Sequence, residues 1–480
     1  MRKKPITRRS FVTQSTVGIA TAALVPELHA EDVSPCHQAT GTRVGEVTPT
    51  SAIVWTRLTR RATRNNNGVT FAKGKKLNSD DVKSPNDLEG ACPGAAGRVR
   101  LRYGPKENLE DCVTTDWMDV SEATDFIHHF RLEKLKPGTQ YHYVSEATGP
   151  GDKTAHNTFR GQFQTAPNED DAAEIRFCVM TCQGYPDRGH LDGHAIYPAM
   201  LELKPHFAML TGDLVYYDND PPVATTPRLA RYHWERMFSL PRLVEFNRKV
   251  ATYWLKDDHD TLNNDSWPGK KAGELTFAEG QKIFRQQAPT SDGPSYRTFR
   301  WGRDLQIWLT DGRDFRSPNN MRDGPQKTIW GKEQKEWFKR TVKESTATWK
   351  VLISPTPLVG PDRKNKNDNH ANEGFKHEGD EIRAWLKEHV PDNFFVVCGD
   401  RHWQYHSVHS TTGLNEFSVG AASDAHAGGS PGEDKAIHRF HRVKGGFLCV
   451  TVRPEGKGSA IRFELRDVDG KVVYTWSPKV

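Results

Sequence analysis

The chain has 480 residues, 35% hydrophobic and 27% charged, a composition typical of a globular protein with more than one domain. No apolar run is long enough to span a bilayer as a helix of the mature chain, which argues against an integral membrane protein. The formal net charge is +6, but residues 1–30 carry five basic side chains and one acidic side chain, so the remainder is near +2. This small excess gives no reason to expect specific nucleic-acid binding.

Residues 1–30 have the order of parts of a twin-arginine signal peptide. A basic start leads into Thr7-Arg8-Arg9-Ser10-Phe11-Val12, a mildly apolar stretch covers residues 17–25, and Ala30 is a small residue suited to cleavage. The alternative interpretation is the amphipathic start of a helix. We predict export through the twin-arginine machinery to the periplasm or medium, a route that suits proteins that bind a metal before leaving the cytoplasm.

The seven cysteines are too few and too irregularly spaced for a disulfide framework. Cys36 and Cys92 lie with Cys112 in the N-terminal third, where one pair could form a disulfide after export. Three others, Cys178, Cys398 and Cys449, lie inside apolar strand-like runs and are predicted to be small core residues.

Residues 33–167 are predicted to form an all-β domain. Residues 51–57 and 98–103 are strand-like, and residues 130–143 give a strand, a Pro137-Gly138 turn and a second strand. The order Leu-x-Pro-Gly-Thr-x-Tyr-x-Tyr resembles the corner of fibronectin type III-like sandwiches, where a tyrosine hydroxyl ties a turn to its strand. Residues 60–95 are predicted to be a long polar loop. We interpret this domain as a β-sandwich that packs on or shields its neighbour.

A polar break at residues 165–171 precedes a second domain, residues 168–480, with an α/β pattern. The predicted strands are 175–180, 207–210, 250–255, 305–309, 349–353 and 394–398, and the predicted helices are 193–203, 227–247, 332–345 and 378–389. This alternation is typical of layered sheets with helices on their faces. Strand-like segments return at 416–419, 447–452 and 460–464, and Asp469-Gly470 is predicted to turn a final pair of strands.

Five of the predicted strands are followed by residue types that bind metals or phosphate. These segments are Thr181-Cys182-Gln183, Gly212-Asp213 with Tyr216, Asp257-Asp258-His259-Asp260, Asp311-Gly312-Arg313-Asp314 and Gly399-Asp400-Arg401-His402. Loops are polar in general, so each segment alone is weak. Because ligand sites of α/β sheets gather at the carboxyl ends of the strands, we expect these side chains to form one site.

The motifs Gly-Asp-x-x-Tyr, Asp-Asp-His-Asp and Gly-Asp-x-His follow, in that order, a cysteine at the first strand end. They resemble the alkaline phosphatase D (PhoD-like) branch of the calcineurin-like metallophosphoesterases, and Gly-Asp-Leu-x-Tyr is also similar to purple acid phosphatases. The resemblance implies an α/β/β/α sandwich behind the all-β domain. It also implies an exported, metal-dependent phosphatase or phosphodiesterase that hydrolyses small phosphate esters.

The resemblance further implies a ligand set. Cys182, Asp213, Tyr216 and His402 would hold ferric iron (Fe3+), and Asp213 would bridge to calcium (Ca2+) with Asp258 and Asp400, and with Asn264 as a further candidate. The third motif departs from the family in ending at Asp260, where glutamate is often found. That departure affects the assignment of Asn264 and of the calcium ligands, but it does not affect the assignment of the iron ligands.

The residue types agree with this chemistry on physical grounds. Thiolate and phenolate ligands stabilise the ferric state, whereas carboxylates suit calcium. Neighbouring cations clamp a phosphate and lower the pKa of bound water, so the attacking group would be a metal-bound hydroxide. His259 is expected to protonate the leaving group or stabilise the transition state, and the alternative is that it only orients Asp258.

Other basic groups are candidates for binding the substrate. Arg313 and Arg316 follow the fourth strand, and guanidinium groups match phosphate geometry, although surface arginines are an equal alternative. The polar loop 361–372 could line the cleft through Arg363, Asn369 and His370, or it could be a solvated excursion. Two other functions stay open: an exported metal-binding or surface module without activity, and a zinc (Zn2+) or manganese (Mn2+) hydrolase of the same fold.

Overall fold

Part of the predicted site follows strands of a nine-stranded mixed sheet. The structure, a computed structural model, describes residues 36–71, 84–456 and 458–478, so the predicted signal peptide lies outside the described residues. In spatial order the strands are β23 (Val472–Trp476), β22 (Gly458–Arg466), β21 (Phe447–Glu455), β9 (Ile175–Met180), β10 (Phe207–Thr211), β11 (Ala251–Leu255), β1 (Thr42–Gly45), β2 (Ala52–Arg57) and β6 (Ile127–Leu132). β9, β10 and β11 are parallel, so their carboxyl ends lie at one edge.

A seven-stranded sheet faces the first. Its strands, in spatial order, are β14 (Arg297–Trp301), β15 (Leu305–Leu309), β16 (Trp349–Ser354), β17 (Phe394–Cys398), β19 (Asn415–Val419), β18 (Gln404–Val408) and β20 (His438–Arg442). The four strands from β15 to β19 run parallel, whereas β14, β18 and β20 pair antiparallel with their neighbours. A two-stranded hairpin, β12 (Lys271–Ala272) and β13 (Leu275–Thr276), stands apart from both sheets.

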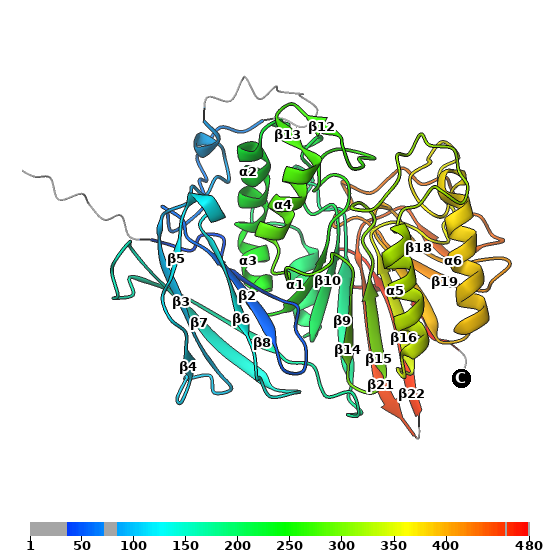
Figure 1. The fold of residues 1–480 in the computed structure, drawn as a ribbon, viewed down its shortest axis with the longest axis horizontal. Coiled ribbons are helices and arrows are strands. Elements are labelled where there is room, and N and C mark those ends of the chain that lie inside the picture. The colour runs from blue at the N-terminus through cyan, green and yellow to red at the C-terminus, as the bar shows by residue number, and fades with distance from the viewer. Residues whose placement is uncertain (1–35, 72–83, 457, 479–480) are drawn as a thin grey trace, which may run out of the picture. The chain divides into compact units, whose positions relative to one another are not determined.

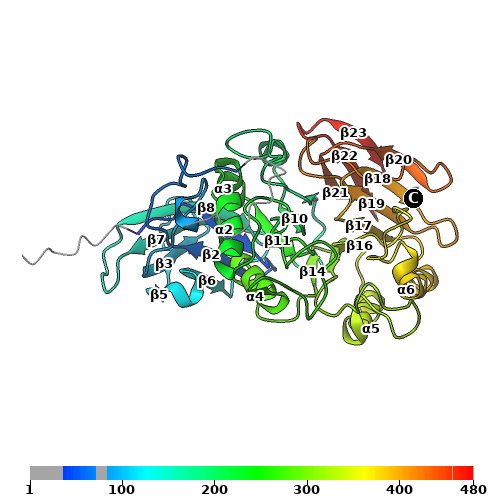
Figure 2. The ribbon, with the colours of Figure 1, turned by 90° about the horizontal axis from the view of Figure 1, so that it is seen from above.

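Helices cover the outer faces of the two sheets. They are α1 (Ile196–Glu202), α2 (Pro227–Phe238), α3 (Pro241–Asn247), α4 (Phe277–Gln287), α5 (Gly331–Glu344) and α6 (Lys376–His389). Figures 1 and 2 show α2–α4 and the pair α5 and α6 on opposite sides of the strands. None of the helices in the described residues is both long enough and apolar enough to cross a bilayer.

Apolar side chains that point alternately to the two faces of the central strands hold the layers of the fold together. In β10, Phe207 and Met209 pack into the core between the sheets, while Ala208 and Leu210 face the core under α1–α4. Every β10 residue is buried, as expected for a parallel strand covered on both faces. A third core lies between the seven-stranded sheet and helices α5 and α6. The predicted α/β/β/α sandwich is therefore confirmed.

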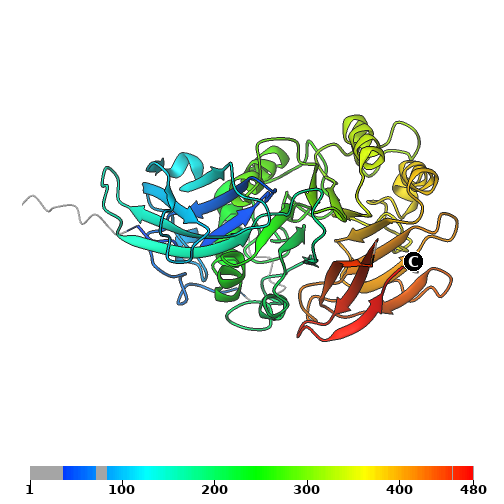
Figure 3. The ribbon, with the colours of Figure 1, turned by 90° about the horizontal axis from the view of Figure 1, so that it is seen from below.

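The N-terminal region completes a β-sandwich by combining its own small sheet with β1, β2 and β6. The small sheet contains β4 (Val113–Thr114), β3 (Gly97–Gly104), β7 (Gln140–Thr148), β8 (Asn157–Gln164) and β5 (Met118–Val120), which pairs with β3. The predicted tyrosine corner is present, because the backbone N–H of Lys136 donates to the Tyr141 hydroxyl at 2.9 Å. Figure 3 shows these blue and cyan strands next to the green segment of the chain.

Two predicted elements differ from the structure. The predicted helix 227–247 is two helices, because Pro241 cannot continue a helix but is favoured at the first position of a new one, α3. Helix α4 was not predicted, although Thr276 and Glu279 form a capping box at its start.

The structure also shows whether the N-terminal cysteines form a disulfide. All seven are free in the structure, including the N-terminal three, so none of those is joined to another. The Cys36 thiol instead donates to the Ala96 carbonyl at 3.3 Å. Cys178, Cys398 and Cys449 are buried, as predicted for core residues.

A candidate metal centre at the strand ends

Three groups of possible metal ligands share one residue, Asp213. The first is Cys182, Asp213 and His402, the second Asp213, Asp258 and His259, and the third Asp213, Asp257 and Asp400. Within each group the ligand atoms lie within 4.8 Å of one another. The four chain segments that supply them follow strands β9, β10 and β11 of one sheet and β17 of the other, so the structure brings these predicted residues together at the strand ends.

The backbone at these strand ends is bent into an uncommon conformation. Cys182, Asp213 and Asp400 have φ angles of 52°, 55° and 61°, in the left-handed region that non-glycine residues rarely adopt. Gly212 has φ 93°, and a Cβ there would lie 2.6 Å from the Cβ of Asp257. Such strain persists where the surrounding structure imposes it, and it frequently marks functional sites.

The Tyr216 phenol lies within the first group of ligands. Its hydroxyl is 3.3 Å from Oδ2 of Asp213 and 3.3 Å from Nε2 of His402. The Cys182 thiol contacts the same Asp213 oxygen at 3.4 Å. The four residues predicted to hold iron therefore surround one point, although they come from distant parts of the chain.

The carboxylates on the other side of Asp213 are held by a buried arginine. Nε of Arg313 donates to Oδ1 of Asp257 at 2.5 Å, and its NH2 lies 3.6 Å from Oδ2 of Asp258. Burial raises the pKa of Asp258, but Arg313 and His259 outweigh burial and hold that pKa well below its usual value. Asp258 is therefore a carboxylate at neutral pH. Asn264 has an exposed side chain, and its backbone N–H donates to Oδ2 of Asp218 at 2.8 Å.

His259 is held by a carboxylate that no motif indicated. Its Nδ1 lies 2.6 Å from Oδ1 of Asp218, and its ring lies over Tyr216 with centroids 4.4 Å apart. With Nδ1 engaged, Nε2 is the ring atom left to face a ligand. Burial lowers the pKa of His259, but the carboxylates of Asp258, Asp218 and Asp213 raise it well above the usual value.

The donor set fits a cation. Burial raises the pKa of Asp213, of the Cys182 thiol and of the Tyr216 phenol well above their usual values, so deprotonating all three needs a compensating positive charge. Burial also lowers the pKa of His402 and keeps it as the neutral imidazole that binds metals. Oδ1 of Asp213 is buried and has no hydrogen-bond partner among the described residues.

Two residues predicted to bind substrate are occupied by the protein itself. Arg313 is fully buried, and its guanidinium faces the carboxylates of Asp257 and Asp258. Arg316 is 3% exposed and donates to the side chain of Asn319 at 2.8 Å and to the Asp368 carbonyl at 2.6 Å. Their residue types suited phosphate, but both guanidinium groups are buried and contact other groups of the protein.

The loop 361–372 packs into the protein at residues 368–370, which are buried, whereas residues 364, 365 and 367 are exposed. Its Asp362 accepts from Arg401 and from Asn369, whose side chain is fully buried. His370 is 1% exposed, and its Nε2 lies 2.9 Å from Oε2 of Glu378 in α6. The contacts of His370 are therefore structural, and they do not fit the predicted substrate-binding role.

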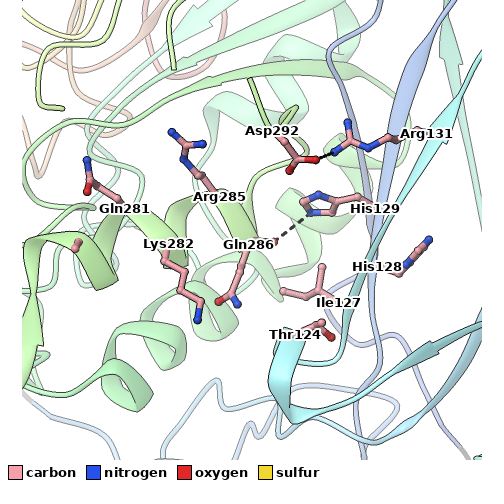
Figure 4. Close-up of a pocket in the computed structure, with 11 residues that line it drawn as sticks. Thr124, Ile127, His128, His129, Arg131, Gln281, Lys282, Arg285, Gln286 and Asp292 are labelled. Atoms are coloured by element: carbon pink, nitrogen blue, oxygen red, sulfur yellow. Dashed lines mark hydrogen bonds and ion pairs between the residues drawn. The ribbon is translucent and has the colours of Figure 1, made fainter. Parts of the chain in front are cut away.

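A cavity of about 630 Å³ lies away from this centre, between β6 and α4 (Figure 4). Its lining includes His129, Arg131 and Asp292, and the last two form an ion pair at 2.6 Å. None of the ligand residues above lines it. Because its only acidic group is paired, this cavity does not offer the clustered carboxylates that the strand ends provide.

The sequence analysis missed His426, which completes the surroundings of Tyr216. Nε2 of His426 lies 2.9 Å from the Tyr216 hydroxyl, and its Nδ1 lies 2.8 Å from Oδ2 of Asp187. His426 follows β19, which pairs in parallel with β17 and so ends at the same edge. Its position after a strand of that sheet is the signal that could have identified it.

Comparisons with known proteins agree with this geometry. Residues 177–444 match the family model described as PhoD-like phosphatase, and residues 25–167 match the model for the PhoD-like phosphatase N-terminal domain. Alkaline phosphatase D of Bacillus subtilis (strain 168) is 22% identical over 375 residues. That match spans 66% of this chain and 60% of the relative's length.

Solved structures show the same fold. The structure of PhoD aligns with a TM-score of 0.69 at 18% identity, covering 92% of this chain and 89% of the other. A purple acid phosphatase from yellow lupin (Lupinus luteus) seeds aligns with a TM-score of 0.62 at 14% identity, covering 91% and 73%. With the family model matching more than half of its residues, the chain belongs to the PhoD-like phosphatase family.

Proposed function

We propose that the protein is a metal-dependent hydrolase of phosphate esters. The observation that carries this proposal is Asp213, which is shared by three groups of possible ligands at one sheet edge. A carboxylate common to neighbouring groups is suited to bridging two cations. Membership of the PhoD-like phosphatase family supports the same reaction class.

The proposed ions are ferric iron and calcium. Cys182, Tyr216 and His402 with Asp213 offer the thiolate, phenolate and imidazole donors that favour iron. The carboxylates of Asp258 and Asp400 with Asp213 offer the oxygen donors that favour calcium. Asn264 stays a prediction, since its side chain is exposed. The alternative is zinc or manganese in the same site. The two assignments differ in the colour of the protein, because neither zinc nor manganese gives a tyrosinate charge-transfer band.

His259 is the proposed general acid. Adjacent cations supply the chemistry of polarising the phosphate and lowering the pKa of a bound water. The protein's own contribution is proton transfer, because Asp218 fixes Nδ1 of His259 and leaves Nε2 for the departing oxygen. The backbone N–H of His259 also donates to Oδ1 of Asp258 at 3.0 Å, so the residue both orients a carboxylate and presents its ring.

Hydrolysis is tested with p-nitrophenyl phosphate and bis-p-nitrophenyl phosphate, using full-length protein exported by its own organism. We expect nitrophenol release from at least one ester and iron with calcium in elemental analysis. A colourless protein holding zinc or manganese would support the alternative hydrolase. Metal-loaded protein that releases nitrophenol from neither ester would favour the inactive metal-binding module.

We also propose export through the twin-arginine pathway, on the sequence of residues 1–30 alone. The expected result is that replacing both Arg8 and Arg9 by lysine keeps the protein in the cytoplasm. Fractionation of cells followed by immunoblotting measures this. Unchanged export of the double variant would reject the pathway without bearing on the hydrolase activity.

A further inference from the structure

We propose that His426 and Asp187 form a positioning pair that holds the Tyr216 phenol at the metal centre. The inference rests on the proposed function, and it assigns a role to two residues outside the predicted ligand set. The contacts form a chain: Asp187 Oδ2 to His426 Nδ1 at 2.8 Å, and His426 Nε2 to the Tyr216 hydroxyl at 2.9 Å. The second of these is shorter than either contact of the phenol with Asp213 or His402, both 3.3 Å.

His426 reaches the centre through Tyr216 rather than as a ligand. Among the described residues, it is absent from the groups whose ligand atoms lie within 4.8 Å of one another. Its ring meets the Tyr216 ring edge-on at a centroid distance of 5.0 Å, and it lies 4.4 Å from the His402 ring. His426 therefore lies behind the phenol. When the ring carries a proton on both nitrogens, Nδ1–H donates to Asp187 and Nε2–H donates to the oxygen that would bind the metal.

The fold holds this pair tightly. The Asp187 side chain is 8% exposed and that of His426 is 14% exposed. The backbone turns back after β9, because the Asp187 N–H donates to the Gly184 carbonyl at 3.2 Å. A Cβ on Gly184 would lie 2.7 Å from Nδ1 of His426, so only glycine leaves room for the ring. A mobile histidine on the surface would require neither glycine at position 184 nor the buried carboxylate of Asp187.

A hydrogen bond to a metal-bound phenolate makes two predictions that a merely structural residue would not. It lowers the energy of the phenolate electrons, so its removal moves a phenolate-to-iron absorption band to longer wavelength. It also fixes the ligand, and loss of such partners typically weakens metal binding by about 10–100-fold. Both quantities are measured on the whole protein with its metals.

The decisive comparison is between two variants of one residue. In H426Q the side-chain amide nitrogen reaches about as far as Nε2 and can still donate to Tyr216. In H426N the shorter amide reaches only the Nδ1 position and its contact with Asp187. We expect H426N to shift the visible band and to weaken iron binding in equilibrium dialysis by about 10–100-fold. H426Q should remain within a few-fold of wild type, and G184A should behave like H426N.

His190, an exposed histidine in the neighbouring loop, supplies the matched control, and H190N should change neither quantity. Equal effects of H426N and H426Q would overturn the positioning role, as would an unshifted band with unchanged metal affinity. If wild-type protein shows no visible band, the ferric assignment fails, and dialysis with the metal it does contain still decides the role of His426. Thermal unfolding of the metal-free variants identifies any that fail to fold.

Discussion

At the scale of single residues, the site depends on Asp213 more than on any other side chain. It contacts the Cys182 thiol and the Tyr216 hydroxyl through one oxygen, while its other oxygen is buried without a partner among the described residues. Because three ligand groups include it, its loss affects both proposed ions together. Removal of a ligand specific to one group should not have that double effect.

The variant D213N tests this shared role. Asparagine keeps the size of the side chain but removes the negative charge that two cations would share. We expect the affinity for both iron and calcium to fall by on the order of 100-fold or more, with a matching loss of phosphatase activity. Elemental analysis after dialysis measures the metals. C182S is the comparison, and it should lose iron while keeping most of the calcium; equal loss of both metals from C182S would contradict the assignment.

The structural role of Arg313 makes a second residue-scale prediction. Replacing it with methionine leaves Asp257 and Asp258 buried without their cation, which typically costs about 3–5 kcal/mol. Urea unfolding of the variant should therefore show a lower free energy of unfolding. If Arg313 instead bound phosphate directly, R313M would raise KM with the unfolding free energy unchanged.

At the scale of elements, the site is built where strands of the two sheets converge. A Cβ on Gly399, at the end of β17, would lie 2.7 Å from the Thr211 carbonyl, 2.8 Å from that of Pro355 and 2.8 Å from the Thr181 hydroxyl. Gly399 therefore lies where β9, β10, β16 and β17 all end. The next residue is Asp400, so close approach of these backbones sets the position of a ligand.

The variant G399A should disturb this convergence. Two of the three close neighbours are backbone atoms, which cannot move aside as a side chain can. Such overpacking typically lowers the free energy of unfolding by about 1–3 kcal/mol. We expect a lower unfolding free energy together with reduced metal content. G293A is the control, because the nearest atom to its Cβ would be the Ser291 hydroxyl at 3.7 Å. Normal metal binding by G399A would show that the convergence does not set the ligand.

Helix α6 makes a prediction about pH. Its Glu378 accepts from the Ile329 N–H at 2.6 Å and pairs with His370. Burial raises its pKa, but the hydrogen bonds from His370, Thr328 and Ile329 outweigh burial and lower the pKa to about 2 from 4.5. The folded-state pKa is the lower one, so this carboxylate stabilises the fold fully above about pH 4.5. That stability is lost as the pH falls towards 2.

The contribution at neutral pH is roughly 3 kcal/mol, from the size of that pKa shift. E378Q should therefore unfold more easily than wild type at pH 7, with the difference shrinking between pH 4.5 and 2. Urea unfolding at a series of pH values measures it. A difference that stays constant over this range would mean that Glu378 titrates normally in the folded protein.

The sequence predicted the central strands well, because each is a short apolar run that ends in a polar turn. Phe207–Thr211 and Phe394–Cys398 are buried throughout, and the residues after them form the site. The sequence did not predict the partners of Arg313 and His370, since a charged side chain is ordinarily exposed and only packing reveals what covers it. His426 was missed for a related reason: the strand before it was predicted, but only the parallel pairing of β19 with β17 shows that the segment after that strand reaches the site.

At the scale of the whole described region, the N-terminal strands are part of a sheet that carries the candidate metal centre. β1 pairs in parallel with β11 through Gly45 and Thr252, which makes β1, β2 and β6 an extension of the nine-stranded sheet. Arg57 of β2 forms a buried ion pair with Glu235 of α2 at 3.2 Å. One apolar core also runs from the sandwich into the space between the large sheets.

A chain beginning at residue 168 should consequently fail to fold. It would expose the edge of β11 and leave buried charge on α2 without Arg57, and exposed strand edges promote aggregation. We expect insoluble protein, or soluble protein without a cooperative thermal transition by circular dichroism. A chain beginning at residue 36 keeps every contact described here and should behave as the full-length protein does. Cooperative unfolding of the shorter chain would show that the two parts are independent.

The placement of β9 has a consequence for how the protein is made. The strand β9, which precedes Cys182, is bordered by β10 on one side and by β21 on the other, and β21 lies far along the chain at residues 447–455. While the ribosome is still adding residues 447–455, β9 lacks one of its two neighbouring strands, and we expect Cys182 to have no fixed position. We therefore expect the metal ions to enter a finished polypeptide rather than a growing one.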